Sequence, residues 1–237
     1  MNDRTDVLIL VGGKGTRLRK VVNDRPKPMA IVAGRPFLEW LLLMLRSQGI
    51  SRVVLCTGYM GQVIETYFGN GNKIGMDIVY AYESVPLGTA GAIRNALNKT
   101  NSERLLVMNG DSYCGLDIDH FRQEHLRVGA RVSLWTVTVD DCSRYGAVEI
   151  SGKNAVLAFR EKTQNKQSGL INAGIYLFER EVIAAIPLGQ IVSLETQVFP
   201  SLIGQGLYAV AGGKSFIDIG TPESYDEAQL FFREKLI

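Results

Sequence analysis

The chain has 237 residues, with 26 Lys or Arg against 24 Asp or Glu, so its formal net charge at pH 7 is only +2. This balance is not typical of a protein that binds nucleic acid by neutralising phosphates, although a small anionic ligand needs only a few local cations. The composition, 46% hydrophobic and 21% charged, is that of a globular protein. The longest apolar runs fall well short of the ~18 residues of a membrane span. We therefore expect neither nucleic acid nor a membrane as partner.

The cysteines and histidines give no sign of a metal site. Cys56, Cys114 and Cys142 form no CxxC pair, and Cys56 lies in an apolar run where a small buried thiol is expected. An odd count without zinc-like spacing is typical of a reducing compartment, and the charged first residues show no signal-peptide pattern. We predict a cytoplasmic protein. His120 and His125 lie in a polar, helix-like segment, where we predict surface positions.

The first 111 residues alternate between strand-like and helix-like segments. The strand patterns cover 6–11, 52–57, 77–82 and 104–111, and the helix patterns cover 36–48, 59–68 and 89–99. Strands and helices that alternate over short connections predict a doubly wound, mostly parallel sheet with right-handed crossovers.

After residue 111 the pattern becomes richer in strands. Strand-like segments at 131–139, 146–150, 154–159 and 171–178 are separated by turns, which predicts an antiparallel ribbon added to the sheet. Helix patterns near 194–203 and at 222–235, with short strands at 207–211 and 216–219, complete the chain. We predict one α/β domain over residues 1–237, with a Rossmann-like, doubly wound mixed sheet and an inserted antiparallel ribbon.

The glycine-rich turn after the first strand reads Val11-Gly12-Gly13-Lys14-Gly15-Thr16-Arg17-Leu18. Glycines let the backbone approach a phosphate and present N–H groups to it. The P-loop pattern GxxxxGK[ST] fails because Gly15 follows Lys14, and the dinucleotide pattern GxGxxG fails because Leu18 stands at the third glycine. The nearby cations favour an anion site over a merely flexible turn.

Lys27 follows soon after, between two prolines in Arg25-Pro26-Lys27-Pro28-Met29. Prolines restrict the backbone on both sides of this lysine. A compact ammonium on a stiff loop suits a phosphate oxygen, while a solvated loop lysine is the alternative.

The motif GGKGTRL followed closely by PKPM resembles the sugar-1-phosphate nucleotidylyltransferases, and the resemblance extends over nearly the whole chain. It implies the nucleotide-diphospho-sugar transferase fold and a reaction of a nucleoside triphosphate with a sugar 1-phosphate that gives a nucleotide-sugar and pyrophosphate. It implies that Arg17, Lys27 and Asp111 are catalytic. The residues that it implies for nucleotide binding are Val11, Gly12, Gly13, Gly15, Thr16, Arg17, Glu83, Gly88, Thr89, Asn109 and Gly110.

The resemblance also implies a Mg²⁺ site held by Asp111, in NGDSY, and Asp218, in IDIGTPESY. Carboxylates and substrate phosphates are the oxygen ligands that Mg²⁺ prefers, with water completing its octahedron. Asp218 as a plain charge at a helix N-terminus is the alternative.

Glu83 lies in the segment that resembles the base-binding loop of the family. A carboxylate only accepts hydrogen bonds, and guanine offers two donors on one edge where thymine and uracil offer one. This favours GTP. The alternative is that Glu83 points to solvent and backbone groups bind the base.

For the sugar phosphate, the resemblance implies Gly146, Glu161, Lys162, Asn172 and Glu195. A surface ion pair of Glu161 with Lys162 and a helix cap at Ser193 are the alternatives. Residues 1–111 would then bind mainly the nucleotide and residues 112–237 mainly the sugar phosphate.

Within the family, Glu83, RYGAVEI, LINAGIYLF and FIDIGTPESY most resemble guanylyltransferases that make GDP-heptose for bacterial surface glycans. Enzymes that act on a hexose 1-phosphate, such as mannose 1-phosphate, with GTP, UTP or dTTP are the alternative. A non-catalytic subunit and a Rossmann dehydrogenase fit less well, because the expected site charges are present and Leu18 breaks the dinucleotide pattern. A homodimer is compatible with the sequence, which leaves the oligomeric state open.

Overall fold

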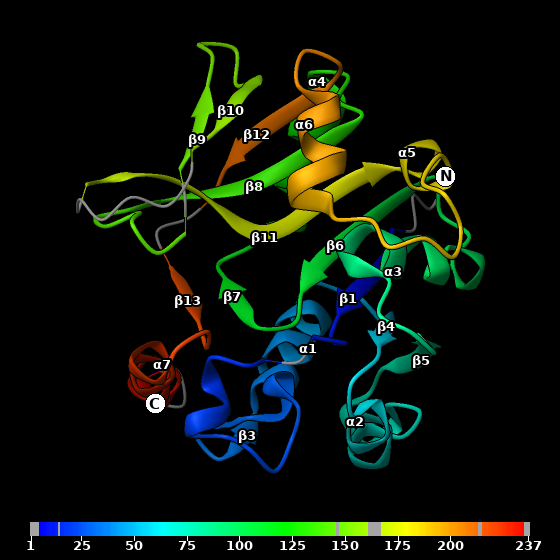
Figure 1. Ribbon diagram of the computed structural model, residues 1–237, viewed down its shortest axis with the longest axis vertical. Helices are drawn as coiled ribbons and strands as arrows, with labels where there is room; N and C mark the ends of the chain where they lie inside the picture. Colours follow the sequence, from blue (N-terminus) through cyan, green and yellow to red (C-terminus); the bar gives the residue numbers. More distant parts are fainter. Residues whose placement is uncertain (1–4, 14, 146, 161–166, 213–214, 235–237) are drawn as a thin grey trace.

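The computed structural model describes residues 5–13, 15–145, 147–160, 167–212 and 215–234, which form an α/β fold around a seven-stranded sheet (Figure 1). The strands of this sheet are β1 (Asp6–Leu10), β4 (Arg52–Thr57), β5 (Asp77–Tyr82), β6 (Arg104–Asn109), β8 (Val132–Val139), β11 (Gly169–Glu179) and β12 (Leu207–Ala211). Their spatial order is β12-β8-β11-β6-β1-β4-β5. β11 runs antiparallel to β6 and β8, and the other neighbours are parallel. The predicted doubly wound mixed sheet is confirmed.

Helices cover both faces of this sheet. Because successive strand residues point to opposite faces, Val7 and Ile9 pack into one apolar cluster and Leu8 into the other. The first cluster includes residues of α1 (Phe37–Ser47), α2 (Gly61–Phe68), α4 (Ile118–Arg127) and α7 (Pro222–Glu234). The second includes residues of α3 (Gly88–Ala96), α5 (Arg180–Ala184) and α6 (Phe199–Leu202). None of the helices described is long and apolar enough to cross a membrane.

Three small antiparallel pairs supplement the sheet. They are β2 (Ile31–Val32) with β3 (Arg35–Pro36), β7 (Ser112–Cys114) with β13 (Phe216–Asp218), and β9 (Val148–Ile150) with β10 (Val156–Phe159). Only β9 and β10 form the separate ribbon that the sequence predicts, since the strands near 131–139 and 171–178 become β8 and β11 of the central sheet. Two polar residues of β8, Ser133 and Thr136, are buried as well, and each has a hydrogen-bond partner there.

His125 corrects the prediction of two surface histidines: His120 is exposed, but His125 is fully buried. Its Nδ1 lies 2.8 Å from Ser133 Oγ and its Nε2 lies 3.2 Å from Glu179 Oε1. Burial lowers the pKa of His125, although the nearby Glu179 carboxylate opposes the shift. The prediction was wrong for His125 because α4 is mostly polar, although its few buried residues, Ile118, Phe121 and His125, face the protein interior. The three cysteines are buried free thiols, as predicted for Cys56.

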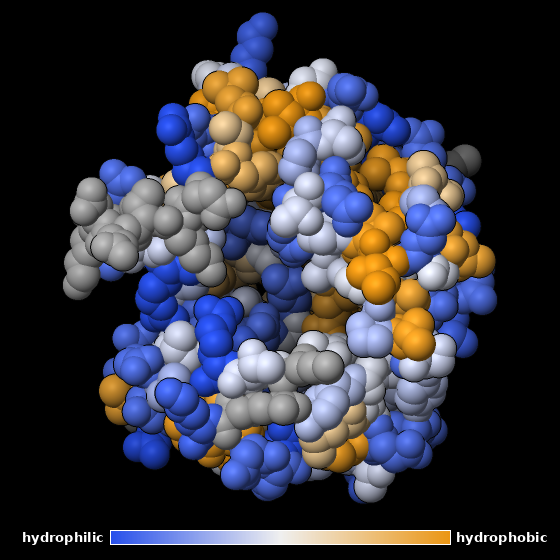
Figure 2. All heavy atoms as spheres, viewed as in Figure 1, coloured by the Kyte–Doolittle hydropathy of each residue, from blue (hydrophilic) through white to orange (hydrophobic). Residues whose placement is uncertain are grey.

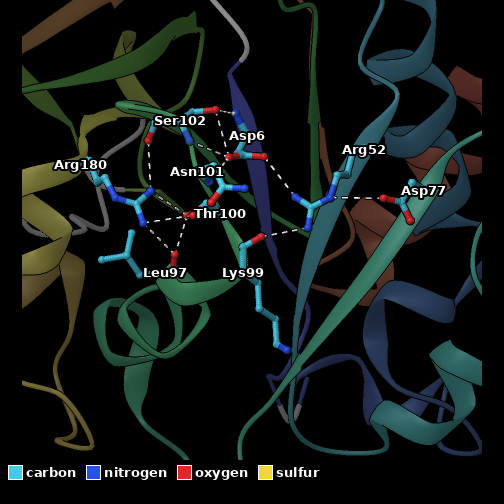
Figure 3. A network of polar contacts seen from close by, with 9 residues as sticks. All are labelled: Asp6, Arg52, Asp77, Leu97, Lys99, Thr100, Asn101, Ser102 and Arg180. Atoms are coloured by element: carbon cyan, nitrogen blue, oxygen red, sulfur yellow. Dashed lines mark hydrogen bonds and ion pairs between the residues drawn. The ribbon is translucent and has the colours of Figure 1, made fainter.

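A polar network ties the strands together at the edge where β1, β4 and β5 begin (Figure 3). Asp6 accepts hydrogen bonds from the backbone N–H groups of Asn101 and Ser102 at 2.6 and 2.9 Å, and pairs with Arg52 at 3.1 Å. Arg180 donates to the carbonyls of Leu97, Thr100 and Ser102, each at 3.1 Å. The network joins β1, β4, α5 and the loop before β6, and so fixes this edge of the sheet.

We predict that Asp6→Asn destabilises the fold in a pH-dependent way. Burial raises the pKa of Asp6, but the hydrogen bonds from Asn101 and Ser102 and the charge of Arg52 outweigh it, so the pKa lies below its ordinary value of 3.8. The stabilisation by the ionised carboxylate is therefore present above about pH 4 and is lost as the pH falls through the lowered folded-state pKa. In urea unfolding near pH 7 the variant should lose about 1–2 kcal/mol.

Asp77→Asn is the matched control, because Asp77 pairs with the same Arg52 at 3.2 Å from a mostly exposed position. Its effect should stay below about 0.5 kcal/mol. A difference between wild type and Asp6→Asn that does not shrink as the pH is lowered from 7 to 3 contradicts the prediction.

Candidate active site

The candidate site lies where the strand order of the sheet reverses, at the carboxyl ends of β1 and β6, which is where open α/β sheets bind ligands. Gly110 N–H donates to the Leu10 carbonyl at 2.9 Å across this point. A Cβ on Gly110 would lie 2.6 Å from Val11 Cγ1, and one on Gly12 would lie 3.0 Å from the backbone nitrogen of Gly58. Glycines therefore let the ends of β1, β4 and β6 meet.

A cavity of about 910 Å³ opens at this edge. Figure 2 shows a hollow near the centre of the molecule, and in the same view the carboxyl end of β6 points towards it (Figure 1). Most of the residues that the sequence singled out line this cavity: Val11, Gly12, Gly13, Gly15, Thr16, Arg17, Lys27, Glu83, Gly88, Thr89, Asn109, Asp111 and Glu195. Residues far apart in the sequence are thus brought together at one site.

Gly110, Asn172 and Asp218 are singled-out residues that are not among the described lining residues of the cavity. Gly110 sits behind the cavity in the contact with Leu10. Asn172 uses its side chain internally, since Nδ2 donates to Tyr176 Oη at 3.0 Å and Oδ1 accepts from Gly174 N–H at 2.9 Å. Asn172 is absent from the described lining of the cavity. Lys14, Gly146, Glu161 and Lys162 lie outside the described residues.

Lys27 points from the proline-flanked loop to Asp111, with its Nζ 2.6 Å from Asp111 Oδ2. The loop forms a short 3₁₀ turn, Lys27–Met29, in which Pro28 and Met29 are buried. Gly15, at φ +58°, packs so closely that a Cβ there would lie 2.8 Å from Lys27 Cβ. The glycine-rich turn and the PKPM segment, two separate motifs in the sequence, are therefore one packed unit that aims Lys27 into the cavity.

Asp218 is held beside Asp111 by the pairing of β13 with β7. Asp218 is in register with Ser112, and Ile219 N–H donates to the Asp111 carbonyl at 3.1 Å. Gly220 N–H and Ser224 Oγ donate to Asp218 Oδ1 at 2.5 and 2.8 Å. Asp218 is therefore far more than a charge at the start of a helix.

The Asp218 carboxylate is stabilised in its ionised form. Burial raises the pKa of this carboxyl, but hydrogen bonds from Tyr145, Gly220 and Ser224 and the charge of Arg144 bring it below its ordinary value. Arg144 Nη2 lies 3.3 Å from Asp218 Oδ2. A buried, ionised carboxylate beside a second aspartate is the kind of oxygen donor set that a divalent cation prefers.

Among the described residues, no group of three or more carboxylates, thiols or imidazoles is placed to hold a metal ion by itself. A metal held by Asp111 and Asp218 therefore depends on further oxygen ligands from substrate phosphates and water, an arrangement that suits Mg²⁺ rather than zinc. Asp111 and Asp218 therefore fit a Mg²⁺ site that substrate phosphates and water complete.

Glu83 faces the cavity rather than open solvent, and is half-buried. Its Oε2 accepts the backbone N–H of Leu87 at 2.8 Å, and its Oε1 lies beside Gly12, 3.2 Å from where a Cβ on that glycine would be. Burial raises the pKa of Glu83, although the Leu87 N–H opposes the shift. The carboxylate is thus oriented by its own loop and presents acceptor capacity to the cavity.

Several residues that line the cavity were not singled out from the sequence. Gly58 and Tyr59 follow β4, Ser84 to Pro86 follow β5, and Gly220 follows β13. The signal was available, because the carboxyl ends of neighbouring parallel strands meet at one edge of the sheet. Ser224, which orients Asp218 from α7, carries no such signal.

Comparison of the sequence with known proteins identifies a family and several relatives of this chain. The sequence profile described as Nucleotidyl transferase matches residues 6–235. The chain is 41% identical over 225 residues to a mannose-1-phosphate guanylyltransferase of Mycobacterium tuberculosis, covering 94% of this chain but only 63% of that protein. It is 38% identical over 225 residues to a D-glycero-alpha-D-manno-heptose 1-phosphate guanylyltransferase of Aneurinibacillus thermoaerophilus, covering 94% of this chain and 96% of that one.

Solved structures agree with the fold. The crystal structure of HddC from Yersinia pseudotuberculosis complexed with GMP-PN superposes with a TM-score of 0.88 at 36% identity, covering 97% of this chain and all of that one. A putative glucose-1-phosphate thymidylyltransferase from Bacillus anthracis, 22% identical, has the same fold with a TM-score of 0.82.

We predict that Gly110→Ala destabilises the protein by about 1–3 kcal/mol, because the added methyl group overpacks the contact between β1 and β6. The measurement is the free energy of unfolding in urea. Gly152→Ala is the matched control, since a Cβ on Gly152 meets nothing within 4 Å. Equal stability of the two variants would show that the close approach at Gly110 is not a constraint.

Proposed function

Because the chain belongs to the nucleotidyl transferase family, we propose that it transfers GMP from GTP to D-glycero-α-D-manno-heptose 1-phosphate, which gives GDP-heptose and pyrophosphate. One observation carries the proposal: a single cavity collects a glycine-rich turn, Arg17, Lys27, Asp111 and the half-buried carboxylate of Glu83. The near-complete coverage of the heptose enzymes supports the choice of acceptor, since the chain spans 96% of the Aneurinibacillus protein.

The proposal includes the division of labour within the chain. Residues 1–237 act as one domain, in which residues 1–111 bind mainly the nucleotide and residues 112–237 mainly the sugar phosphate. The enzyme works in the cytoplasm, as a monomer or homodimer, and its product feeds the synthesis of bacterial surface glycans such as capsule, lipopolysaccharide or S-layer glycan.

In the proposed reaction an oxygen of the sugar phosphate attacks the α-phosphorus of GTP in line. The bond from this phosphorus to the bridging oxygen breaks, and pyrophosphate leaves. Phosphoryl transfer needs positioning and charge neutralisation more than a protein nucleophile. The N–H groups of the glycine-rich turn bind the phosphates, while Arg17 and Lys27 stabilise the charge that develops on the reacting group.

Asp111 and Asp218 would hold Mg²⁺ together with oxygens of the substrate phosphates. When bound, the ion neutralises phosphate charge and helps to orient the reacting groups. Lys27, which pairs with Asp111 at 2.6 Å, also supplies positive charge beside these carboxylates. The low pKa of Asp218 keeps that carboxylate ionised at neutral pH.

Glu83 would select guanine. Its carboxylate accepts hydrogen bonds only, and guanine presents an N1–H and an exocyclic amine on one edge. The Leu87 N–H holds Oε2 in place and leaves acceptor capacity at Oε1. Asn109 and Gly88 line the same cavity and complete the nucleotide contacts of the proposal.

A mannose-1-phosphate guanylyltransferase is the second candidate. It is favoured by the 41% identity to the Mycobacterium tuberculosis protein of that name, of which the chain spans 63%. The two candidates share the nucleotide and the chemistry and differ in the acceptor. Transfer from UTP or dTTP to a hexose 1-phosphate is a weaker alternative, because Glu83 suits those bases less well.

A matrix of four nucleoside triphosphates against several sugar 1-phosphates tests the proposal. GTP with D-glycero-α-D-manno-heptose 1-phosphate should release pyrophosphate with the highest kcat/KM, and EDTA should stop the release until Mg²⁺ is restored. A higher kcat/KM for mannose 1-phosphate selects the second candidate. Absence of pyrophosphate release from every pair contradicts both.

We predict that Lys27→Ala lowers kcat on the order of 10²-fold or more, as expected for the loss of a preorganised charge at the reacting group. The measurement is pyrophosphate release at saturating GTP and acceptor. Lys20→Ala is the control, because Lys20 is an exposed cation close in sequence but outside the cavity lining. A comparable fall in kcat for both variants would mean that general charge near the turn, rather than Lys27 itself, is what matters.

We also predict that Glu83→Gln weakens the preference for GTP over UTP and dTTP by about tenfold, because an amide loses one acceptor for the guanine edge and gains a donor for a pyrimidine carbonyl. The readout is the ratio of kcat/KM values for the three nucleotides with one acceptor. Glu65→Gln, at a helix position outside the cavity lining where the carboxylate pairs with Tyr82, serves as control. An unchanged ratio in Glu83→Gln removes the base-recognition argument.

A further inference from the structure

Two segments from opposite halves of the chain pack backbone to backbone at one rim of the cavity. The first, 87–91, begins α3, and the second is 190–195. Ala90 N–H donates to the Val192 carbonyl at 2.9 Å, and Val192 N–H donates to the Leu87 carbonyl at 2.9 Å. A Cβ on Gly88, at φ +73°, would lie 2.5 Å from the Val192 carbonyl oxygen. The glycine is thus required for the two segments to meet.

The hydroxyl of Thr89 is the polar centre of this contact. It accepts the backbone N–H of Leu194 at 2.8 Å and lies 2.8 Å from Glu195 Oε2. A hydroxyl has one proton, and a carboxylate oxygen only accepts hydrogen bonds, so the Thr89 hydroxyl donates its proton to Glu195 while its oxygen accepts the Leu194 N–H. The preferred χ1 rotamers of a β-branched side chain further restrict this geometry.

Ser193 adds a second donor to the same carboxylate oxygen. Its Oγ lies 2.9 Å from Glu195 Oε2 and accepts the N–H of Thr196 at 3.2 Å. This serine begins a single π-helical turn, Leu194–Val198, that leads into α6. Such turns are rare and frequently occur at functional sites. Ser193 is therefore both a helix cap and a ligand of the Glu195 carboxylate.

These contacts leave the outer oxygen of Glu195 available. Among the described residues no hydrogen bond reaches Oε1, and Glu195 is an exposed residue that lines the cavity. Two hydroxyls hold Oε2 and so fix the direction in which Oε1 points. An exposed glutamate without such partners would lose considerable side-chain entropy on binding a ligand.

We propose that Thr89 is a positioning residue for the acceptor rather than a nucleotide ligand: its hydroxyl orients Glu195 so that the free carboxylate oxygen accepts a hydroxyl of the sugar 1-phosphate. This inference rests on the proposed function and names the residue through which the start of α3 determines the sugar contact. The start of α3 and the proposed sugar contact at Glu195 are then held together by one hydrogen bond, although Thr89 and Glu195 are 106 positions apart in the sequence.

The test compares the two Michaelis constants of Thr89→Val, which keeps the shape of the side chain but lacks the hydroxyl. The KM for the sugar 1-phosphate should rise about tenfold, a loss in the range of one hydrogen bond to a charged group, while the KM for GTP changes less than about twofold. Thr89→Ser restores the hydroxyl and should recover most of the lost acceptor affinity. Thr196→Val, the same substitution on the neighbouring turn, is the matched control and should leave both constants within about twofold.

A double-mutant cycle with Glu195→Ala tests whether Thr89 acts through Glu195. Thr89→Val should add little to the acceptor KM once Glu195 is truncated, because coupled residues are not additive. Melting temperatures of all variants identify any that fail to fold, and Thr89→Ser then carries the comparison.

Three results separate the inference from the function on which it rests. A rise in the KM for GTP equal to that for the acceptor, or additive effects in the cycle, overturns the role of Thr89 while leaving the enzyme activity intact. Pyrophosphate release by the wild type that never depends on a sugar 1-phosphate overturns the proposed function itself. A selective, non-additive rise in the acceptor KM supports the inference.

Discussion

The close approach of two backbones at the switch point is the constraint on which the rest of the structure depends. Gly110 N–H reaches the Leu10 carbonyl at a point where a Cβ on Gly110 would lie 2.8 Å from that carbonyl oxygen, and a Cβ on Gly12 would likewise crowd Gly58 after β4. This contact sets the carboxyl ends of β1 and β6 side by side, and the cavity opens above them. The loops that follow these strands therefore converge on one point, which is the general reason why open α/β sheets bind ligands there.

The charges of the molecule are organised around this point. A net charge of +2 conceals a cavity where Lys27 pairs with Asp111. Close to Asp111, Asp218 stays ionised through hydrogen bonds from Tyr145, Gly220 and Ser224. The pairing of β7 with β13 brings the two aspartates together from distant parts of the chain. A second pair from distant parts of the chain meets at the cavity, where Thr89 donates a hydrogen bond to Glu195. In both cases a tertiary contact joins the first half of the chain to the second.

The opposite edge of the sheet is built for stability instead. Asp6, Arg52 and Arg180 satisfy backbone groups of the loop before β6, and His125 is buried against Ser133 and Glu179. None of these residues lines the described cavity. The edge with the cavity instead carries glycines and a π-helical turn, features that are costly for the fold and useful for binding ligands.

The sequence by itself located many of the strands and helices and singled out the residues of the candidate loops. Apolar periodicity located β1, β4, β5 and α1 nearly to the residue, and GGKGTRL with PKPM singled out Arg17 and Lys27, because these signals depend on neighbours within a few positions. Only the tertiary structure decided that β8 and β11 join the central sheet, that His125 is buried, that Asn172 hydrogen-bonds within its own strand, and that Thr89 holds Glu195. Each of these depends on which distant segment packs alongside, and local backbone preference carries no information about that choice.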